Sequence, residues 1–92
     1  MYELEYSGKF KKDLKRCVAR GWNLSALQVV IDLLQADGKL PVEYHPHRLS
    51  GKFAHYWECH IEPDWLLIYD VKDTIRLISI ARTGTHSDIF KK

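Results

Sequence analysis

Residues 53–69, FAHYWECHIEPDWLLIY, predict two antiparallel strands joined by a tight turn. Apolar and polar residues alternate in the first half, as in a strand with one covered face. The alternation places Phe53, Trp57, Cys59 and Ile61 on one face and Tyr56, Glu58 and His60 on the other. The triplet EPD favours a turn, because Pro63 fixes its backbone φ and Asp64 can accept hydrogen bonds from nearby N–H groups. The run WLLIY is apolar throughout, which is typical of a central strand covered on both faces.

The segments on either side of this hairpin predict two helices and two further strands. Residues 2–6, YELEY, alternate like a strand, and residues 74–81, TIRLISIA, add another strand. Ser7 and Asn23 can cap two helices that end near Gly21 and Gly38. Because helices come first and strands afterwards, we expect an α+β fold. In it, two N-terminal helices pack on one face of a twisted, mainly antiparallel sheet of four to five strands.

Length and composition are typical of one soluble domain. The chain has 92 residues, 46% of them apolar and 28% charged, so we expect a single domain over residues 1–92. Cys17 and Cys59 lack metal-site spacing and are too few for a disulfide framework, so we expect buried free thiols. The first residues are charged and no apolar run approaches membrane-spanning length. These features predict a cytoplasmic protein with no membrane partner.

Histidine, arginine and aspartate are expected to meet at one rim of the sheet. The hairpin brings His60 and Asp64 to that rim, and a last strand paired beside WLLIY returns Arg82 and His86 to it. Imidazole can take or give a proton near neutral pH, and arginine can hold the charge of a phosphorane. The set therefore suits cleavage of RNA through attack by the ribose 2′-OH, with no metal required.

The segment RTGTHSDIF, residues 82–90, brings the chain to a polar, sharply turning end. Gly84 permits a turn that a Cβ would obstruct, and Thr83 and Thr85 can tie it through their hydroxyls. By the alternation of a strand, Arg82 falls on the same face as the covered residues before it. It must therefore lie beyond the covered part of the sheet or be re-aimed by a β-bulge.

The other histidines leave two alternatives open. His45 and His55 are expected to be structural, although His45 and His47 could bind zinc together with His60 or His86. The zinc alternative is disfavoured, because a structural zinc site needs four ligands and neither cysteine is suitably placed.

The motifs LSGKF, ECHIEPDWLLIY and RTGTHSDIF, at their spacing, resemble the YafQ branch of the RelE/ParE toxin superfamily. The resemblance covers the chain from its first strand to Phe90. It implies the RelE-like, microbial-ribonuclease type of fold and an endoribonuclease that cuts mRNA in the A site of the 70S ribosome. It also implies a DinJ-like antitoxin with a ribbon–helix–helix domain as partner. We expect a monomer when the toxin is free and a hetero-oligomer with the antitoxin.

The resemblance also assigns catalytic roles, to His47, His60, Asp64, Arg82 and His86. His86 would be the general acid, and Arg82 would steady the charge of the phosphate. The remaining three would share the base and positioning roles, and which of them takes the proton stays open.

Other residues are expected to act around this set. Trp65 and Phe90 would be core anchors first and would also position the substrate or His86. Contacts with RNA or the ribosome would come from the basic first helix, through Lys11, Lys12, Lys15 and Arg16. A plain solvated helix face is the alternative for these four. Trp57 stands where the family usually has an arginine, so it could either extend the core or offer a stacking face.

A second class of function fits the same superfamily. Members of the ParE branch share the fold but inhibit DNA gyrase and lack the histidines. The alternative is therefore a non-catalytic module that binds gyrase or an antitoxin. The presence of His47, His60 and His86 favours the nuclease.

Overall fold

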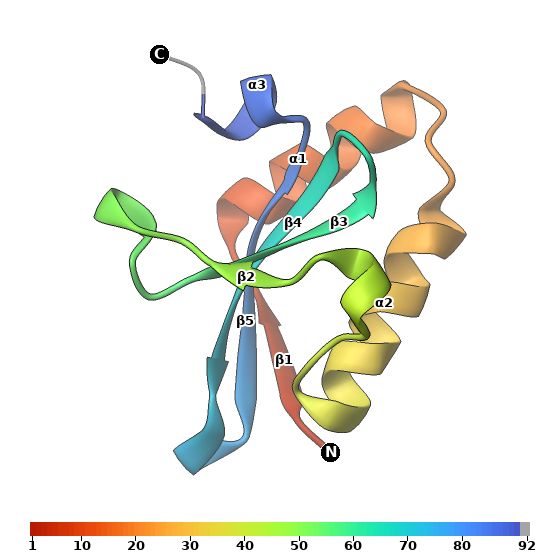
Figure 1. Cartoon of the computed structure of the whole chain (residues 1–92). Helices are drawn as coiled ribbons and strands as arrows, with labels where there is room; N and C mark the ends of the chain where they lie inside the picture. The colour runs from red at the N-terminus through yellow and green to blue at the C-terminus, as the bar shows by residue number, and fades with distance from the viewer. Residues whose placement is uncertain (91–92) are drawn as a thin grey trace.

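A five-stranded sheet runs through the computed structural model, which describes residues 1–90. The strands are β1 (Glu3–Tyr6), β2 (His47–Arg48), β3 (Trp57–Glu62), β4 (Trp65–Lys72) and β5 (Leu77–Gly84), in the spatial order β1-β5-β4-β3-β2. β1 is parallel to β5 and the other pairs are antiparallel (Figure 1). The predicted α+β fold with a mainly antiparallel sheet is confirmed.

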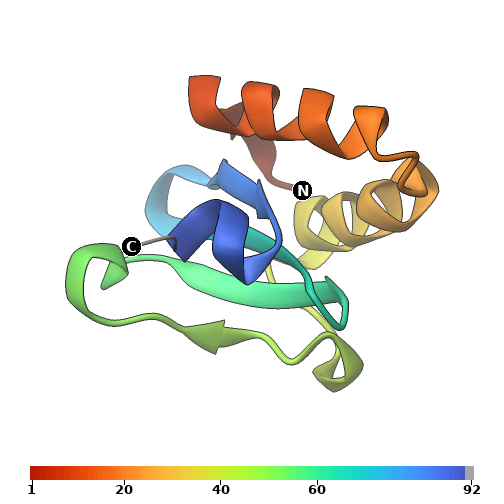
Figure 2. The same ribbon diagram turned by 90° about the horizontal axis from the view of Figure 1, so that it is seen from above.

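The two predicted helices are α1 (Gly8–Ala19) and α2 (Leu24–Asp37). Ser7 accepts a hydrogen bond from the backbone N of Phe10 at 2.9 Å, and Asn23 accepts one from Ser25 at 3.0 Å, so both predicted caps are present. α2 ends at Gly38, whose φ of 73° favours glycine. Figure 2 shows α1 beside β1 and β5, with β2 at the opposite edge of the sheet.

Two apolar cores lie on opposite faces of the sheet. In the larger core, both helices pack against the sheet. Both cysteines are buried there as free thiols, as expected. The smaller core gathers Leu66, Ile68 and Ile89, with Leu49, Phe53, Tyr56, Ala81 and Phe90 around them. β4 belongs to both, because Trp65 through Tyr69 are all buried. The central-strand prediction for WLLIY is confirmed.

The predicted alternation fails at its first residue. Phe53 lies in the short 3₁₀ helix η2 (Gly51–Phe53), before β3 begins. It packs in the smaller core, 5.3 Å between ring centroids from Phe90 and 6.1 Å from Tyr56, so it does not share a face with Trp57. A 3₁₀ turn has three residues per turn, so the two-residue period of a strand does not extend back through it.

A β-bulge re-aims Arg82, as its parity required. Ile68 pairs with Arg82 and Tyr69 pairs with Ile80, which leaves Ala81 without an opposite residue. From Arg82 onward, the side chains therefore alternate between the two faces of the sheet one residue out of step with those before Ala81.

A third helix, α3 (His86–Phe90), was not predicted. The Thr85 hydroxyl accepts from the backbone N of Asp88 at 3.0 Å, and the Asp88 carboxylate accepts from the backbone N of Thr85 at 2.9 Å. This reciprocal capping box starts the helix. Gly84 precedes it with a φ of 145°, and a Cβ there would lie 2.8 Å from the Asp88 carboxylate. In residues 1–90, no helix is long and apolar enough to cross a membrane.

Candidate active site

Four imidazole rings gather where β2, β3 and α3 meet. The ring of His60 lies 6.3 Å from His47, 6.0 Å from His86 and 5.9 Å from His45, between centroids. His60 is carried by β3, while His86 is the first residue of α3. His47, His60 and His86 are therefore brought together, and His45 joins them from the loop before β2. His55 is exposed in the loop before β3.

Asp64 orients His86 through two contacts. Its Oδ1 accepts from the backbone N of His86 at 3.1 Å and lies 2.9 Å from the ring Nδ1. Hydrogen bonds from His86 lower the pKa of the Asp64 carboxyl. A carboxylate only accepts, so Nδ1 carries a proton and the ring presents Nε2 as its second nitrogen. Both side chains are more than half exposed, so this pair faces solvent.

Glu58 is a member of the site that the sequence prediction missed. Its side chain is only 6% exposed, and its Oε1 lies 3.0 Å from Nε2 of His47 and 3.8 Å from Nε2 of His60. The register brings it opposite His47, because β2 and β3 pair these two residues. A signal was present in the alternation, which put Glu58 on the same face as His60.

The tautomers of His47 and His60 follow from their neighbours. Nδ1 of His47 lies 2.9 Å from the carbonyl of His45, so it is the donor there, and Nε2 lies 3.0 Å from the buried carboxylate of Glu58. Nδ1 of His60 lies 3.2 Å from the carbonyl of Pro63, which leaves Nε2 of the neutral ring able to accept a proton.

Arg82 lies in an ion-pair network away from the imidazole contacts. Its Nε is 2.7 Å and its Nη2 3.1 Å from the Asp13 carboxylate, and Nη2 also reaches the carbonyl of Asp88 at 3.4 Å. The Asp13 carboxylate, 3% exposed, also accepts from the backbone N of Thr83 at 3.1 Å. The hydrogen bond to Asp13 raises the pKa of Arg82. The guanidinium thus joins α1, β5 and α3, and no contact with a histidine is recorded for it in residues 1–90.

Asp88 extends this network to the end of α1. Arg20 donates to both of its carboxylate oxygens, at 2.7 and 2.9 Å, and holds the pKa of Asp88 well below its usual range. Arg16 lies 3.6 Å from both Asp13 and Asp88, so its charge is shared with the network. Of the four residues predicted to contact RNA, Lys11, Lys12 and Lys15 are exposed on α1 and are not members of this ion-pair network.

The predicted positioning residues lie on different faces. Phe90 is 6.2 Å from the ring of His86 and packs on Phe53, so it supports the site from α3. Trp65 is buried, donates to the Thr83 hydroxyl at 2.9 Å, and belongs to the larger core.

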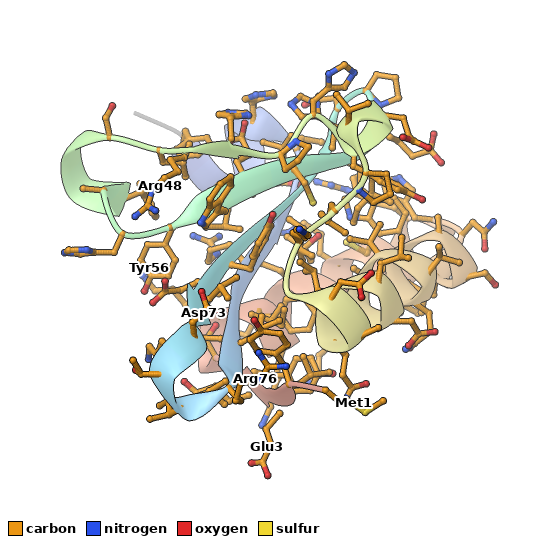
Figure 3. The ribbon with its side chains drawn as sticks, turned by 60° about the horizontal axis from the view of Figure 1, so that its bottom comes forward. Met1, Glu3, Arg48, Tyr56, Asp73 and Arg76 are labelled. Atoms are coloured by element: carbon orange, nitrogen blue, oxygen red, sulfur yellow. The ribbon has the colours of Figure 1, made fainter. Side chains whose placement is uncertain are left out.

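Trp57 packs rather than joining the histidines. Its ring stacks on Tyr69, 6.5 Å between centroids and 13° between planes, and Arg48 lies over it at 5.5 Å. Figure 3 shows Arg48 on β2. In the part of the chain that the structure describes, no group of three or more potential ligands is arranged to hold a metal ion, so the zinc alternative gains no support.

Comparison with known proteins identifies the family. Residues 2–91 match the model of the YafQ toxin, a bacterial toxin of type II toxin–antitoxin systems. The chain belongs to the YafQ toxin family. The resemblance inferred from the sequence motifs is confirmed, and the protein is a toxin of a type II toxin–antitoxin system.

Three relatives show how closely the toxin matches this family. The mRNA interferase toxin YafQ of Escherichia coli K12 is 38% identical over 89 residues, which cover 96% of this chain and 95% of that one. The crystal structure of the E. coli DinJ–YafQ complex matches with a TM-score of 0.88 at 37% identity, covering 98% and 99% of the two chains. A metal-bound toxin from Helicobacter pylori matches with a TM-score of 0.89 at 38% identity, covering 98% and 100%.

Proposed function

We propose that this toxin is a ribosome-dependent mRNA endoribonuclease whose proton transfers need no metal ion. The E. coli relative is named an mRNA interferase, and the imidazoles of this chain supply the matching chemistry. The observation that carries the proposal is the convergence of His47, His60 and His86 from three separate elements, with the rings of His47 and His86 each about 6 Å from that of His60. Attack of a ribose 2′-OH needs one group that takes a proton and one that gives it.

His60 is the general base in this proposal. Its Nδ1 is held by the carbonyl of Pro63, so the free Nε2 can accept the proton of the 2′-OH. The contact between His47 and Glu58 lies beside it, since Glu58 is 3.8 Å from the same Nε2. When His60 accepts the proton its ring becomes an imidazolium, and the nearby Glu58 carboxylate can stabilise that positive charge.

His86 is the general acid. The carboxylate of Asp64 stabilises the imidazolium form at Nδ1, and Nε2–H then donates to the leaving 5′ oxygen. Phe90 supports the ring from the other end of α3. The Nη1 of Arg82 has no recorded partner in residues 1–90 and is assigned to the phosphate charge, while its other nitrogens hold Asp13.

The partners follow from the family and from the charged surface. The E. coli relative forms a complex with DinJ, and we assign this toxin a DinJ-like ribbon–helix–helix antitoxin in the bacterial cytoplasm. Free toxin is a monomer in this scheme and joins a hetero-oligomer with the antitoxin. The 70S ribosome presents the mRNA in its A site, where the exposed lysines of α1, Lys11, Lys12 and Lys15, contact RNA phosphates, with Arg16 beside them.

The decisive test is induction of wild-type toxin beside His86→Ala and His55→Ala, with transcript ends mapped by primer extension. We expect defined cuts from wild type and from His55→Ala, whose imidazole is outside the cluster, and a loss of roughly 10²–10⁴-fold in His86→Ala. Both variants should bind the antitoxin. Undiminished cleavage by folded His86→Ala would contradict the proposal, and DNA damage with intact transcripts would indicate gyrase inhibition. Cleavage by purified toxin on ribosomes should persist in a chelator selective for transition metals, which leaves the Mg²⁺ of the ribosome in place.

A further inference from the structure

A cleft of about 420 Å³ adjoins the histidine site on the side of the loop between α1 and α2. It is lined by Trp22, Asn23, Glu62, Asp64, Trp65 and Thr85. Two of these residues connect it directly with the active site, because Asp64 binds His86 and Thr85 immediately precedes it. Its volume falls in the range of small-ligand sites.

The wall of the cleft is aromatic and fixed in place. Trp65 is buried and tied to Thr83, and the Trp22 ring packs on it at 4.9 Å between centroids. Arg20 lies 4.9 Å from the Trp22 ring while binding Asp88, which pins the tryptophan to the network under α3. Trp22 itself is only partly buried, so it offers surface on which a planar ring can pack.

The polar groups of the cleft favour a ligand that carries N–H donors. Asn23 uses its Oδ1 to cap α2, which leaves its NH₂ group as a donor. Glu62 is exposed, and no partner is recorded within residues 1–90 for its carboxylate or for the Oδ2 of Asp64. The lining therefore has two carboxylates, one amide donor and no cation. Such a cleft repels a phosphate and suits an apolar ring that carries N–H groups.

We propose that this cleft binds one base of the substrate RNA beside the scissile phosphate and favours bases with an exocyclic amine over uracil. Adenine, cytosine and guanine each present an amine to the carboxylates and a ring nitrogen or carbonyl to the amide of Asn23. Uracil has no amine, and its one N–H donor, N3–H, lies between two carbonyl oxygens, so a carboxylate that accepts from it is brought close to two acceptors. The inference rests on the proposed nuclease function, because the base belongs to RNA whose phosphate lies at His60 and His86.

Binding is tested with nucleoside 5′-monophosphates and ¹⁵N-labelled toxin separated from its antitoxin. The chain has three tryptophans, so three indole N–H signals report on three places. We expect AMP, GMP and CMP to shift the signals of Trp22 and Trp65 but not that of Trp57, and UMP to bind roughly 10-fold more weakly. Trp22→Leu should weaken AMP binding about 10-fold. Equal affinity for UMP, or shifts confined to Trp57, would overturn the proposal.

Glu62→Gln tests recognition without disturbing the fold, because the residue is exposed. The change keeps the shape of the side chain but replaces one acceptor oxygen of the carboxylate with an NH₂ donor. We expect this variant to lose most of the discrimination against UMP and to redistribute transcript ends towards sites with uracil. Glu3→Gln is the matched control, an exposed carboxylate on β1, which Figure 3 shows at the bottom of the molecule. It should match wild type in both measurements.

The outcomes distinguish this inference from the proposed function. If Glu62→Gln alters UMP binding but leaves the transcript ends unchanged, the bound base does not come from the substrate and the inference fails. If the ends are unchanged and UMP binds as before, it fails as well. Both results leave the nuclease proposal standing, provided that His86→Ala has lost cleavage. Cleavage that persists in His86→Ala contradicts the proposed function itself, whatever the cleft binds.

Discussion

Two sets of contacts meet at α3: His86 lies beside the ring of His60 and the Asp64 carboxylate, whereas guanidinium groups bind Asp88. On the histidine side, the pair of His86 and Asp64 is more than half exposed in both members. On the arginine side, Asp13 is buried and Arg82 keeps only 18% of its side chain exposed. A five-residue helix has no stability of its own, so it depends on such contacts. The difference indicates that the arginine side holds α3 in place while the histidine side stays open for a substrate.

The largest expected effect comes from breaking the buried side. Asp13→Ala leaves the guanidinium of Arg82 without its carboxylate and the backbone N of Thr83 without its acceptor. We expect a loss of about 2–3 kcal/mol in the free energy of unfolding, measured in urea. This is less than the ~3–5 kcal/mol of fully buried pairs, because Arg82 keeps some solvent contact. Asp37→Asn, at an exposed acid, is the control, and equal stabilities for the two variants would contradict the comparison.

The exposed side should respond in activity and not in stability. Asp64→Asn keeps the shape of the side chain but removes the charge that favours the imidazolium of His86. We expect cleavage to fall roughly 10-fold, a part of the ~10²–10⁴-fold that a general acid contributes, with an unchanged urea midpoint. If Asp64→Asn lowered the urea midpoint but left the cleavage rate unchanged, the assignment of the two sides would be reversed.

A smaller loss of stability is expected from Arg20→Gln, because this arginine is more exposed than Arg82. The variant removes both hydrogen bonds to Asp88 but leaves the capping box with Thr85 intact. The urea midpoint should fall by less than in Asp13→Ala. A loss as large as that of Asp13→Ala would show that Arg20, and not Asp13, holds α3.

The smallest effect is a dependence on pH that sharpens the same comparison. Arg20 and Thr85 lower the pKa of Asp88 in the folded state, so the carboxylate stabilises the fold above its unfolded pKa of about 3.9. That contribution is lost as the pH falls below this value towards the folded pKa. Between about pH 4 and pH 2, wild type should therefore lose more stability than Arg20→Gln. Parallel curves for the two proteins would exclude this contribution.

Local patterns were sufficient for most of the secondary structure. Ser7 and Asn23 cap the helices that their positions predicted, and WLLIY is a central strand. The start of α3 was also readable, since T-x-x-D at residues 85–88 is a capping-box pattern, although the short segment after it lacks helical periodicity. The error at Phe53 arose because one strand period was extended across a 3₁₀ turn.

For some polar side chains, only the tertiary structure decided the partner. Sequence motifs predicted the meeting of His60, Asp64 and His86, because a hairpin and an adjacent strand impose it. The pairing of Glu58 with His47 depends on β2, a two-residue strand whose register no local pattern indicates.

Arg82 illustrates the same division. Its parity required a bulge or an exposed position, and the bulge is present. That its guanidinium binds Asp13, 69 residues earlier, follows from β1 lying parallel beside β5 and from α1 starting where β1 ends. Hydrogen bonds within a turn or a cap act between near neighbours and are visible in the sequence. Ion pairs across the fold depend on the path of the whole chain.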